Sequence, residues 1–205
     1  MITILIQGPT KYYTNILDNI FNLKYNIIWS TFEDEPQENI KQISKNCELI
    51  LNPKPVINGY GNINLQTQST INGIKKTKDD LILKIRSDII VSDYNRLIQI
   101  LLSDTEKLWF LAWSDSEIPY PVDYISFGNR QEMSIFWDFF SVNNYSFAEK
   151  QLLDNYCFKK SIKIINLGSI FNYFLKQINN QDIELKWLKN NIILNNYIYD
   201  KFLKG

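Results

Sequence analysis

Residues 1–113 alternate short apolar runs with segments in which apolar residues recur at helical spacing. Short apolar runs are typical of buried strands, and helical spacing is typical of amphipathic helices that cover a sheet. We expect strands at 2–6, 25–31, 48–51, 79–91 and 108–113, and helices that include 37–45 and 63–78. This alternation predicts a single Rossmann-type α/β domain with a mostly parallel central sheet flanked by helices.

The pattern changes after residue 113. A Pro-rich loop leads to a short expected strand at 124–127, and an aromatic-rich helix follows it. Ser146 and Glu149 have the spacing of a capping box, which predicts the start of a further helix. Residues 162–205 are rich in Asn, Ile and Tyr, and their pattern does not order the elements. Neither an internal repeat nor a flexible linker is visible, so we expect one domain over 1–205.

Composition excludes several classes of function. Lys plus Arg and Asp plus Glu both total 22, so there is no basic excess to favour nucleic acid as a partner. Histidine is absent, which removes Ser-His and Cys-His nucleophile pairs and every His-containing zinc site. Proton transfer must therefore use Asp, Glu, Lys, Tyr or Cys.

The N-terminus and the cysteines bear on location. The first apolar run is too short to span a membrane and has no signal-peptide features, so no transmembrane segment is expected. Cys47 and Cys157 lie far apart without a C-x-x-C partner, which favours buried thiols in a reducing compartment. A cytoplasmic location is the resulting expectation.

The run 79–91, DDLILKIRSDIIV, changes from apolar to polar near its carboxyl end. Successive side chains of a strand point to opposite faces, so Lys84, Arg86 and Asp88 share one face. Such charges are costly in a buried strand unless they pair with one another or bind a ligand. Ligands of open α/β sheets sit beyond the carboxyl ends of the strands, so we expect a phosphate-bearing ligand here. An internal ion network is the alternative.

Several short motifs recur in this order in one known family. They are Ile6-Gln7-Gly8-Pro9, Ser30-Thr31, Gln68-Ser69-x-x-x-Gly73, Lys84-x-Arg86-x-Asp88 and Asp123-x-x-x-x-Gly128. The set resembles the WavE-type lipopolysaccharide-synthesis glycosyltransferases, relatives of the GT-A nucleotide-sugar transferases. The resemblance extends through Glu149.

The resemblance implies a GT-A-like sheet, a nucleotide-diphosphate sugar donor such as a UDP-sugar, and a divalent metal held by an Asp-x-Asp motif. Arg86 stands here where that motif has its first Asp, and Asp88 keeps the second position. Two readings stay open. Either Asp88 alone holds Mn²⁺ or Mg²⁺ with the diphosphate, or Arg86 does part of the work of the metal.

The resemblance also implies roles for individual residues, with 1–113 binding the nucleotide sugar and 114–205 facing the acceptor. Glu149 would be the base that takes the acceptor proton, and Asp123 would bind the donor sugar or the acceptor hydroxyl. Helix capping is the alternative for Glu149, and a turn is the alternative for Asp123. The expected donor-binding residues are Gln7, Gly8, Pro9, Thr31, Gln66, Gln68, Ser69, Lys84, Arg86 and Ser87.

The function that we predict is an inverting, metal-assisted glycosyltransferase of hexosyl or deoxyhexosyl type that extends a glycan or polysaccharide. Association with other glycan-synthesis proteins is a further expectation. One alternative is a non-catalytic nucleotide- or carbohydrate-binding module. Another is a sugar nucleotidyltransferase, which would need a Gly-rich, basic phosphate loop after the first strand, and Gln7-Gly8-Pro9-Thr10 is a poor one.

Overall fold

The computed structural model describes residues 1–113, 120–142, 146–162, 175–178 and 183–194. The strands are β1 Ile2–Gln7, β2 Asn26–Phe32, β3 Glu48–Asn52, β4 Leu81–Arg86, β5 Ile89–Val91, β6 Leu108–Trp113, β7 Tyr120–Asn129, β8 Leu175–Gln177, β9 Leu185–Trp187 and β10 Ile192–Ile193. The helices are η1 Thr10–Tyr12, α1 Tyr13–Ile20, α2 Gln37–Ile43, η2 Tyr60–Asn62, α3 Ile63–Lys76, α4 Tyr94–Leu101, α5 Arg130–Trp137 and α6 Ala148–Lys159.

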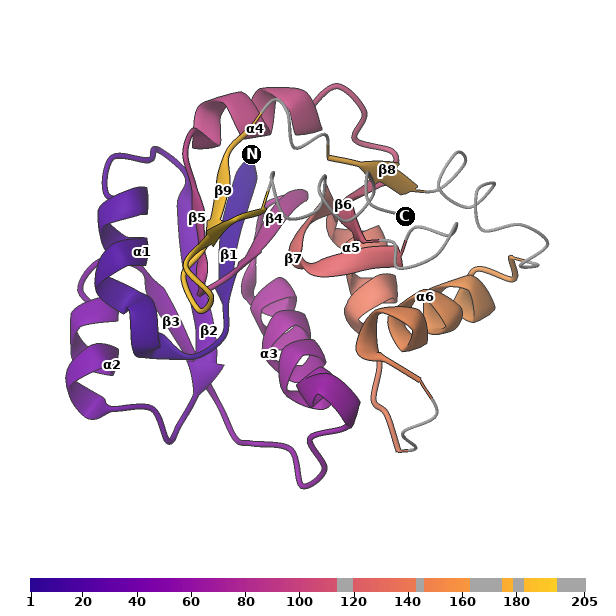
Figure 1. The fold of residues 1–205 in the computed structure, drawn as a ribbon, viewed down its shortest axis with the longest axis horizontal. Coiled ribbons are helices and arrows are strands. Elements are labelled where there is room, and N and C mark those ends of the chain that lie inside the picture. The colour runs from indigo at the N-terminus through magenta and orange to yellow at the C-terminus, as the bar shows by residue number, and fades with distance from the viewer. Residues whose placement is uncertain (114–119, 143–145, 163–174, 179–182, 195–205) are drawn as a thin grey trace.

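The central sheet has seven strands in the order β3-β2-β1-β4-β7-β6-β8 (Figure 1). Strand β7 runs antiparallel to both of its neighbours, β4 and β6, and the other pairs are parallel. The predicted mostly parallel α/β sheet is therefore confirmed. A small second sheet has the order β10-β9-β5.

Helices cover both faces of the central sheet, and alternate side chains of β1 show how (Figure 1). Ile4 and Ile6 belong to the core shared with α1, α2 and α4, whereas Leu5 belongs to the core shared with α3, α5 and α6. Gly73 lets α3 lie directly on β1, because a Cβ there would be 2.4 Å from Leu5 Cδ1. This contact holds α3 beside the carboxyl end of β1.

The run 79–91 is not one strand, as the sequence suggested, but two strands in different sheets. Strand β4 ends at Arg86, and the chain turns at Ser87 and Asp88 before β5 pairs with β9. The Ser87 N–H donates to the Gln7 carbonyl (2.8 Å), and its hydroxyl donates to the Pro9 carbonyl (2.7 Å). These bonds tie the turn to the end of β1, so Ser87 and Asp88 leave the central sheet, whereas Lys84 and Arg86 remain in β4.

Helix starts follow local capping in two places and depart from it in a third. The carboxylate of Asp93 accepts from the Arg96 N–H at 2.9 Å, and Asn129 caps α5 in the same way through Glu132. The expected capping box at Ser146 and Glu149 is wrong. Helix α6 has Phe147 as its N-cap without a side-chain bond, because the helix begins one residue later than the box requires.

Two further findings concern the described residues alone. Cys47 and Cys157 are free thiols, Cys157 buried and Cys47 half-buried. None of the helices in the described part of the chain is both long enough and apolar enough to span a membrane.

Candidate functional site

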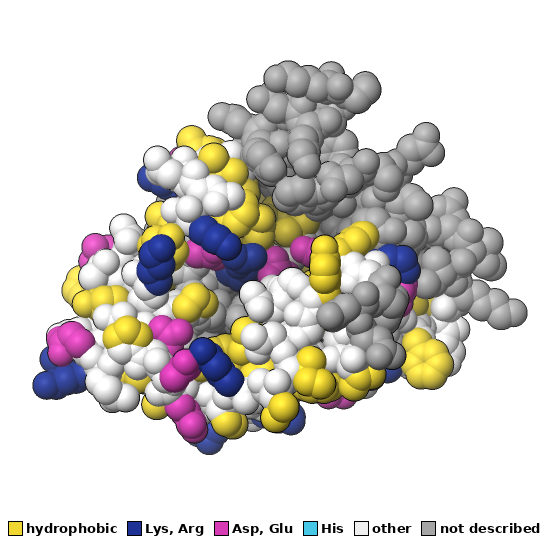
Figure 2. Space-filling view, turned by 60° about the horizontal axis from the view of Figure 1, so that its bottom comes forward, with side chains coloured by type: hydrophobic (Ala, Val, Ile, Leu, Met, Phe, Trp, Pro, Cys, Tyr) yellow, Lys and Arg dark blue, Asp and Glu magenta, His cyan; other side chains and the backbone are white. Residues whose placement is uncertain are grey.

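A cavity of about 390 Å³ lies at the carboxyl ends of β1 and β4. Dark-blue basic side chains gather on this face of the molecule, with acidic ones among them (Figure 2). The predicted site residues that line the cavity are Gln7, Gly8, Pro9, Gln66, Arg86, Ser87 and Asp88. The other lining residues are Lys11, Tyr12, Phe32, Glu35, Lys54, Asn62, Leu65 and Lys189.

The floor of the cavity is backbone that the sequence allows to approach closely. Gly8 has φ +127°, and a Cβ there would lie 2.7 Å from the Ser87 hydroxyl oxygen. Only glycine adopts this conformation at low cost. The Trp29 indole N–H donates to the Gly8 carbonyl at 3.3 Å, and the Gly8 N–H donates to the Ser30 carbonyl at 3.1 Å. Hydrogen bonds with β2 thus hold the turn after β1 in place.

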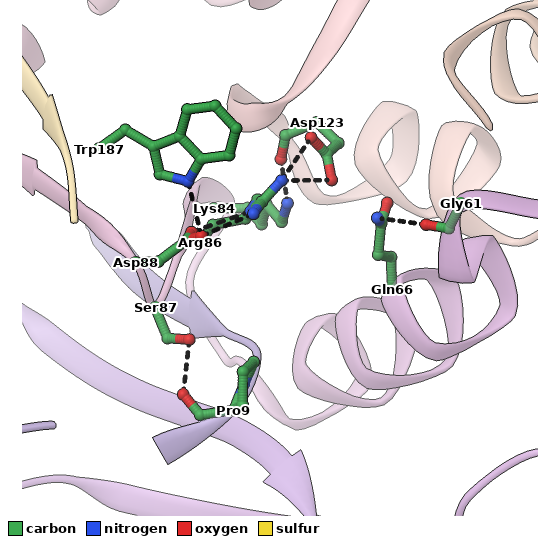
Figure 3. Close-up of polar contacts among 9 residues, drawn as sticks. All are labelled: Pro9, Gly61, Gln66, Lys84, Arg86, Ser87, Asp88, Asp123 and Trp187. Atoms are coloured by element: carbon green, nitrogen blue, oxygen red, sulfur yellow. Dashed lines mark hydrogen bonds and ion pairs between the residues drawn. The ribbon is translucent and has the colours of Figure 1, made fainter. Parts of the chain in front are cut away.

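Four charged residues form a carboxyl-end cluster beside this floor: Lys84, Arg86, Asp88 and Asp123 (Figure 3). Arg86 pairs with Asp88 through Nε (3.0 Å) and Nη2 (2.7 Å), and its Nη1 lies 3.2 Å from Asp123 Oδ1. The Trp187 indole N–H donates at 2.8 Å to Asp88 Oδ2, the oxygen that also accepts from Arg86 Nη2. Arg86 therefore lies between two carboxylates, one from the turn after β4 and one from β7.

Aromatic rings pack against the Arg86 guanidinium. Its centre lies 4.7 Å from the Tyr124 ring centroid and 5.9 Å from that of Trp187. Burial opposes the charge, but the carboxylates of Asp123 and Asp88 raise the pKa of Arg86 above its ordinary value. The guanidinium is a permanent cation here, and 21% of its side chain remains accessible.

Lys84 is fully buried and is not part of the cavity lining. Its ammonium donates to the Asp123 main-chain carbonyl and lies 4.6 Å from the Trp137 ring centroid. Burial lowers the pKa of Lys84 to about 7, against the opposing effect of the Asp123 carboxylate. The alternative of an internal ion network thus describes Lys84 better than contact with a ligand.

The acidic residues here do not fit a divalent metal ion. Both carboxylate oxygens of Asp88 accept from Arg86, and both oxygens of Asp123 lie within 3.3 Å of Arg86 Nη1. A metal would have to displace a cation and would then be repelled by it. Across the residues that the structure describes, no group of three or more Asp, Glu or Cys is arranged to hold a metal. Metal binding at Asp88 stays a prediction.

Two glutamine side chains of the lining each have a buried amide oxygen without a partner in the described structure. Gln7, only 5% exposed, donates through Nε2 to the Ser69 hydroxyl at 3.0 Å, which leaves its Oε1 unpaired. Gln66 donates to the Gly61 carbonyl at 3.2 Å, and its Oε1 is likewise unpaired (Figure 3). Buried polar atoms are nearly always hydrogen-bonded, so two such atoms beside one cavity point to a bound ligand.

Other predicted donor contacts lie behind the lining. Thr31 is buried with an unpaired hydroxyl, and Ser69 holds Gln7 while donating to the Leu65 carbonyl at 2.7 Å. Gln68 donates to the Pro53 carbonyl at 2.6 Å. None of the three lines the cavity. Their donor contacts stay predictions, and in this structure Ser69 and Gln68 support the walls.

Glu149 lies in the first turn of α6, outside the cavity lining. Burial raises the pKa of its carboxyl, and the negative charge of Asp123 raises it further. Arg86 acts in the opposite direction, so Glu149 lies within electrostatic reach of the carboxyl-end cluster. A carboxylate with a raised pKa near such a cluster is suited to accept a proton.

Sequence reasoning missed several parts of the site. Lys11 directly follows the Gln7–Thr10 turn and could have been found as a basic residue beside a phosphate loop. Trp187 and Lys189 come from the β9–β10 hairpin, about which local pattern carried no signal. Phe136 and Trp137, from the aromatic-rich helix, are fully buried and belong to the core rather than to the site.

Comparison with known proteins supports the fold. No protein-family model matches the chain, and no curated protein sequence matches it. Among solved structures, one described as a glucose-1-phosphate thymidylyltransferase from Bacillus anthracis superposes with a TM-score of 0.57 at 10% identity, covering 98% of this chain and 96% of that one. The galactosyltransferase LgtC, in complex with donor and acceptor sugar analogs, gives 0.50 at 10% identity, covering 88% and 74%.

A third structure, described as a nucleotide-diphospho-sugar transferase from Desulfovibrio desulfuricans G20, gives 0.50 at 10% identity and covers 86% of this chain and 78% of that one. Similarity at this level of identity concerns the fold, and the narrower WavE-type resemblance stays a prediction. The chain therefore has the Rossmann-like α/β fold found in nucleotide-diphospho-sugar transferases and in a thymidylyltransferase.

Proposed function

We propose that this chain is a glycosyltransferase that moves a sugar from a nucleotide-diphosphate sugar to a glycan or polysaccharide acceptor. One observation carries the proposal: the cavity at the carboxyl ends of β1 and β4 combines basic side chains with unpaired, buried amide oxygens. Basic groups suit a diphosphate, and amide oxygens suit the N–H and O–H groups of a base, a ribose or a sugar.

The proposed donor-contacting residues are those that line the cavity. Gly8 and Pro9 form its floor, and Arg86 and Ser87 face the diphosphate. Gln7 and Gln66 accept hydrogen bonds from the nucleoside or the sugar through their unpaired oxygens. Lys84, Thr31, Gln68 and Ser69 are left out of this set, because they are not among the residues that line the cavity.

The proposed reaction is a direct displacement with inversion at the anomeric carbon. The acceptor hydroxyl oxygen forms a bond to the anomeric carbon while the bond between that carbon and the diphosphate oxygen breaks. The nucleoside diphosphate leaves with the electron pair. Glu149 takes the proton of the hydroxyl, which its raised pKa favours. Asp123 orients Arg86 at 3.2 Å, so that the guanidinium meets the charge that builds on the leaving group.

The setting that we propose is the cytoplasm, beside other proteins of glycan synthesis. The two free thiols suit a reducing compartment. The sugar is proposed to be a hexose or a deoxyhexose, and UDP is the first nucleotide to test.

A sugar nucleotidyltransferase is the second candidate, because this chain spans 96% of the thymidylyltransferase-like structure but 74% of LgtC. The two reactions differ in what they release. A nucleotidyltransferase given a sugar 1-phosphate and a nucleoside triphosphate releases pyrophosphate. A glycosyltransferase given a nucleotide sugar releases a nucleoside diphosphate, and pyrophosphate release alone would replace our proposal with the second candidate.

Thermal-shift measurement with nucleoside diphosphates tests the donor site. UDP or GDP is expected to raise the melting temperature in a concentration-dependent way, because a ligand that binds only the folded state stabilises it. Gln66→Met is expected to reduce the shift, whereas Gln99→Met, at an exposed position on α4, is the matched control. Failure of every nucleoside diphosphate to shift the melting temperature would refute the donor site.

A further inference from the structure

The Arg86 guanidinium occupies the space between Asp88 and Asp123, where a metal bridging these carboxylates would have to lie (Figure 3). Its Nε and Nη2 bond to Asp88 at 3.0 and 2.7 Å, and its Nη1 lies 3.2 Å from Asp123. The Trp187 indole adds a further bond to Asp88 at 2.8 Å. Both carboxylates are thus already paired with a cation that cannot lose its proton.

The charges of the cluster leave little positive charge to spare for a ligand. Arg86 faces two carboxylates, and Lys84, which could compensate one of them, is sealed behind the lining. A donor diphosphate brings negative charges of its own, and they must be met by cations from elsewhere. Other basic side chains of the cavity lining must therefore supply this positive charge.

Lys11 and Lys189 are two lysines that line the same cavity. Both are exposed, and neither forms an ion pair within the part of the chain that the structure describes. Lys54, the third lysine of the lining, differs because its ammonium pairs with Asp34 at 2.5 Å. Lys11 and Lys189 are thus the cations best placed to move onto a phosphate.

The turn that carries Lys189 is held directly to the cluster. The Leu188 N–H donates to the Asp88 carbonyl at 2.8 Å, and Trp187 bonds to the Asp88 carboxylate. Strand β9 also pairs with β5, which begins directly after Asp88. Asp88 therefore acts here as a positioning residue, because it holds Arg86 on one side and the β9–β10 turn on the other.

We propose that this chain binds its donor diphosphate without a divalent metal, with Arg86 as a fixed cation and Lys11 and Lys189 as cations that close onto the phosphates. The inference rests on the proposed donor site and deepens it. Charge-assisted N–H bonds from these three groups would meet the charge on the leaving diphosphate, which is the task of the metal in an Asp-x-Asp site.

Isothermal titration of the whole chain with UDP and GDP, in excess EDTA and then in Mn²⁺, tests this inference. We expect the affinity to be the same within about twofold in the two buffers, and to fall as salt rises. Lys11→Ala and Lys189→Ala are each expected to lower it about tenfold, as for the loss of one charge-assisted bond. Lys186→Ala, at an exposed lysine on the same hairpin, is the matched control and is expected to change nothing.

Arg86→Asp adds a second test, because it creates the Asp-x-Asp sequence. We expect this variant to lose diphosphate binding in EDTA and to recover part of it with Mn²⁺. Should it fail to fold, the titrations of the unchanged protein in EDTA and in Mn²⁺ decide on the metal, and the lysine variants decide on Lys11 and Lys189.

Three results would overturn the inference. If the unchanged protein binds UDP or GDP only with Mn²⁺, the donor site stands and the metal-free inference is wrong. If Lys11→Ala and Lys189→Ala both bind as well as Lys186→Ala does, the assignment of the two lysines is wrong. If no nucleoside diphosphate binds in either buffer, the proposed function fails and takes this inference with it.

Discussion

Two polar clusters lie at opposite ends of the same parallel strands. The amino-end cluster consists of Thr3, Asn26, Thr77 and Asp79. One oxygen of the Asp79 carboxylate accepts from Thr3 (2.9 Å) and from Asn26 (2.8 Å), and the Thr3 and Thr77 hydroxyls lie 2.5 Å apart. The carboxyl-end cluster consists instead of charged residues and lies beside a cavity whose lining includes unpaired amide oxygens.

The difference shows how a buried polar group can be assigned to structure or to function. The hydrogen bonds of the amino-end cluster run between its own members, so it stabilises the ends of β1, β2 and β4 without a ligand. At the carboxyl end, Gln7 and Gln66 line the cavity, and the buried side-chain oxygen of each has no partner in the described structure. Leaving a buried acceptor unpaired costs folding stability, and a ligand that fills the cavity can recover that cost on binding.

Glu149→Gln is the change with the largest expected effect, and it acts only at the carboxyl end. Turnover of a nucleotide sugar should fall by about 10²- to 10⁴-fold, because an amide cannot accept the acceptor proton. Affinity for UDP or GDP should stay within about twofold, since Glu149 lies outside the donor cavity. Steady-state kinetics and titration measure the two quantities. Preserved turnover would remove Glu149 as the base.

Asp79→Ala, in the amino-end cluster, should lower folding stability without affecting the carboxyl-end site. We expect the free energy of unfolding to fall by about 2 kcal/mol, because the change removes the two bonds that the Asp79 carboxylate accepts, one of them from the buried Thr3 hydroxyl. Nucleoside diphosphate binding below the melting temperature should be unchanged. Urea unfolding measures the change in stability, and titration with a nucleoside diphosphate measures binding. A variant that keeps its stability but loses binding would mean that the two ends are not independent.

Gln7→Met is the counterpart at the carboxyl end. Diphosphate affinity should fall about tenfold, because the unpaired Oε1 is the proposed donor contact. The free energy of unfolding should change by less than about 1 kcal/mol, since only the bond to Ser69 is lost and one unpaired buried acceptor is removed. Asp79→Ala, measured in the same assays, is the opposite control. A large loss of stability without loss of binding would assign Gln7 to the structural class.

The pH dependence of stability gives the smallest expected effect. The pKa of Glu149 is raised in the folded state, so its contribution is present at low pH and is lost as pH rises through the raised value. Glu149→Gln should therefore melt a degree or two above the parent chain near neutral pH. At a pH below the ordinary glutamate pKa the two should agree. If Glu149→Gln raised the melting temperature equally at both pH values, the gain would come from packing rather than from the ionisation of Glu149.

Much of the site could be predicted because its pieces end neighbouring parallel strands. Gln7 ends β1 and Arg86 ends β4, and the register of this parallel pair sets the two residues side by side. The helical spacing that predicted 63–78 likewise puts Gln66 on α3, beside the same edge. These placements follow from periodicity and from the rule that parallel strands share one carboxyl edge.

Other parts depended on pairing that no local pattern encodes. Residues 79–91 read as one strand, yet the chain breaks at Ser87 because that turn gains bonds to the end of β1. Lys84 looked like a ligand contact, but β7 covers it with the Asp123 carbonyl and α5 covers it with Trp137. Burial by distant segments cannot be read from alternation alone.

By itself the sequence determined the α/β class, the alternating units of residues 1–113, and the polar ends of β1 and β4, because periodicity and turn chemistry are local properties. The tertiary structure alone decided that β7 enters antiparallel between β4 and β6, which sets Asp123 against Arg86. It also decided that the β9–β10 hairpin returns to Asp88 with Trp187 and Lys189. The reason is that such long-range contacts are selected by the burial and pairing of whole elements, which short stretches of sequence do not specify.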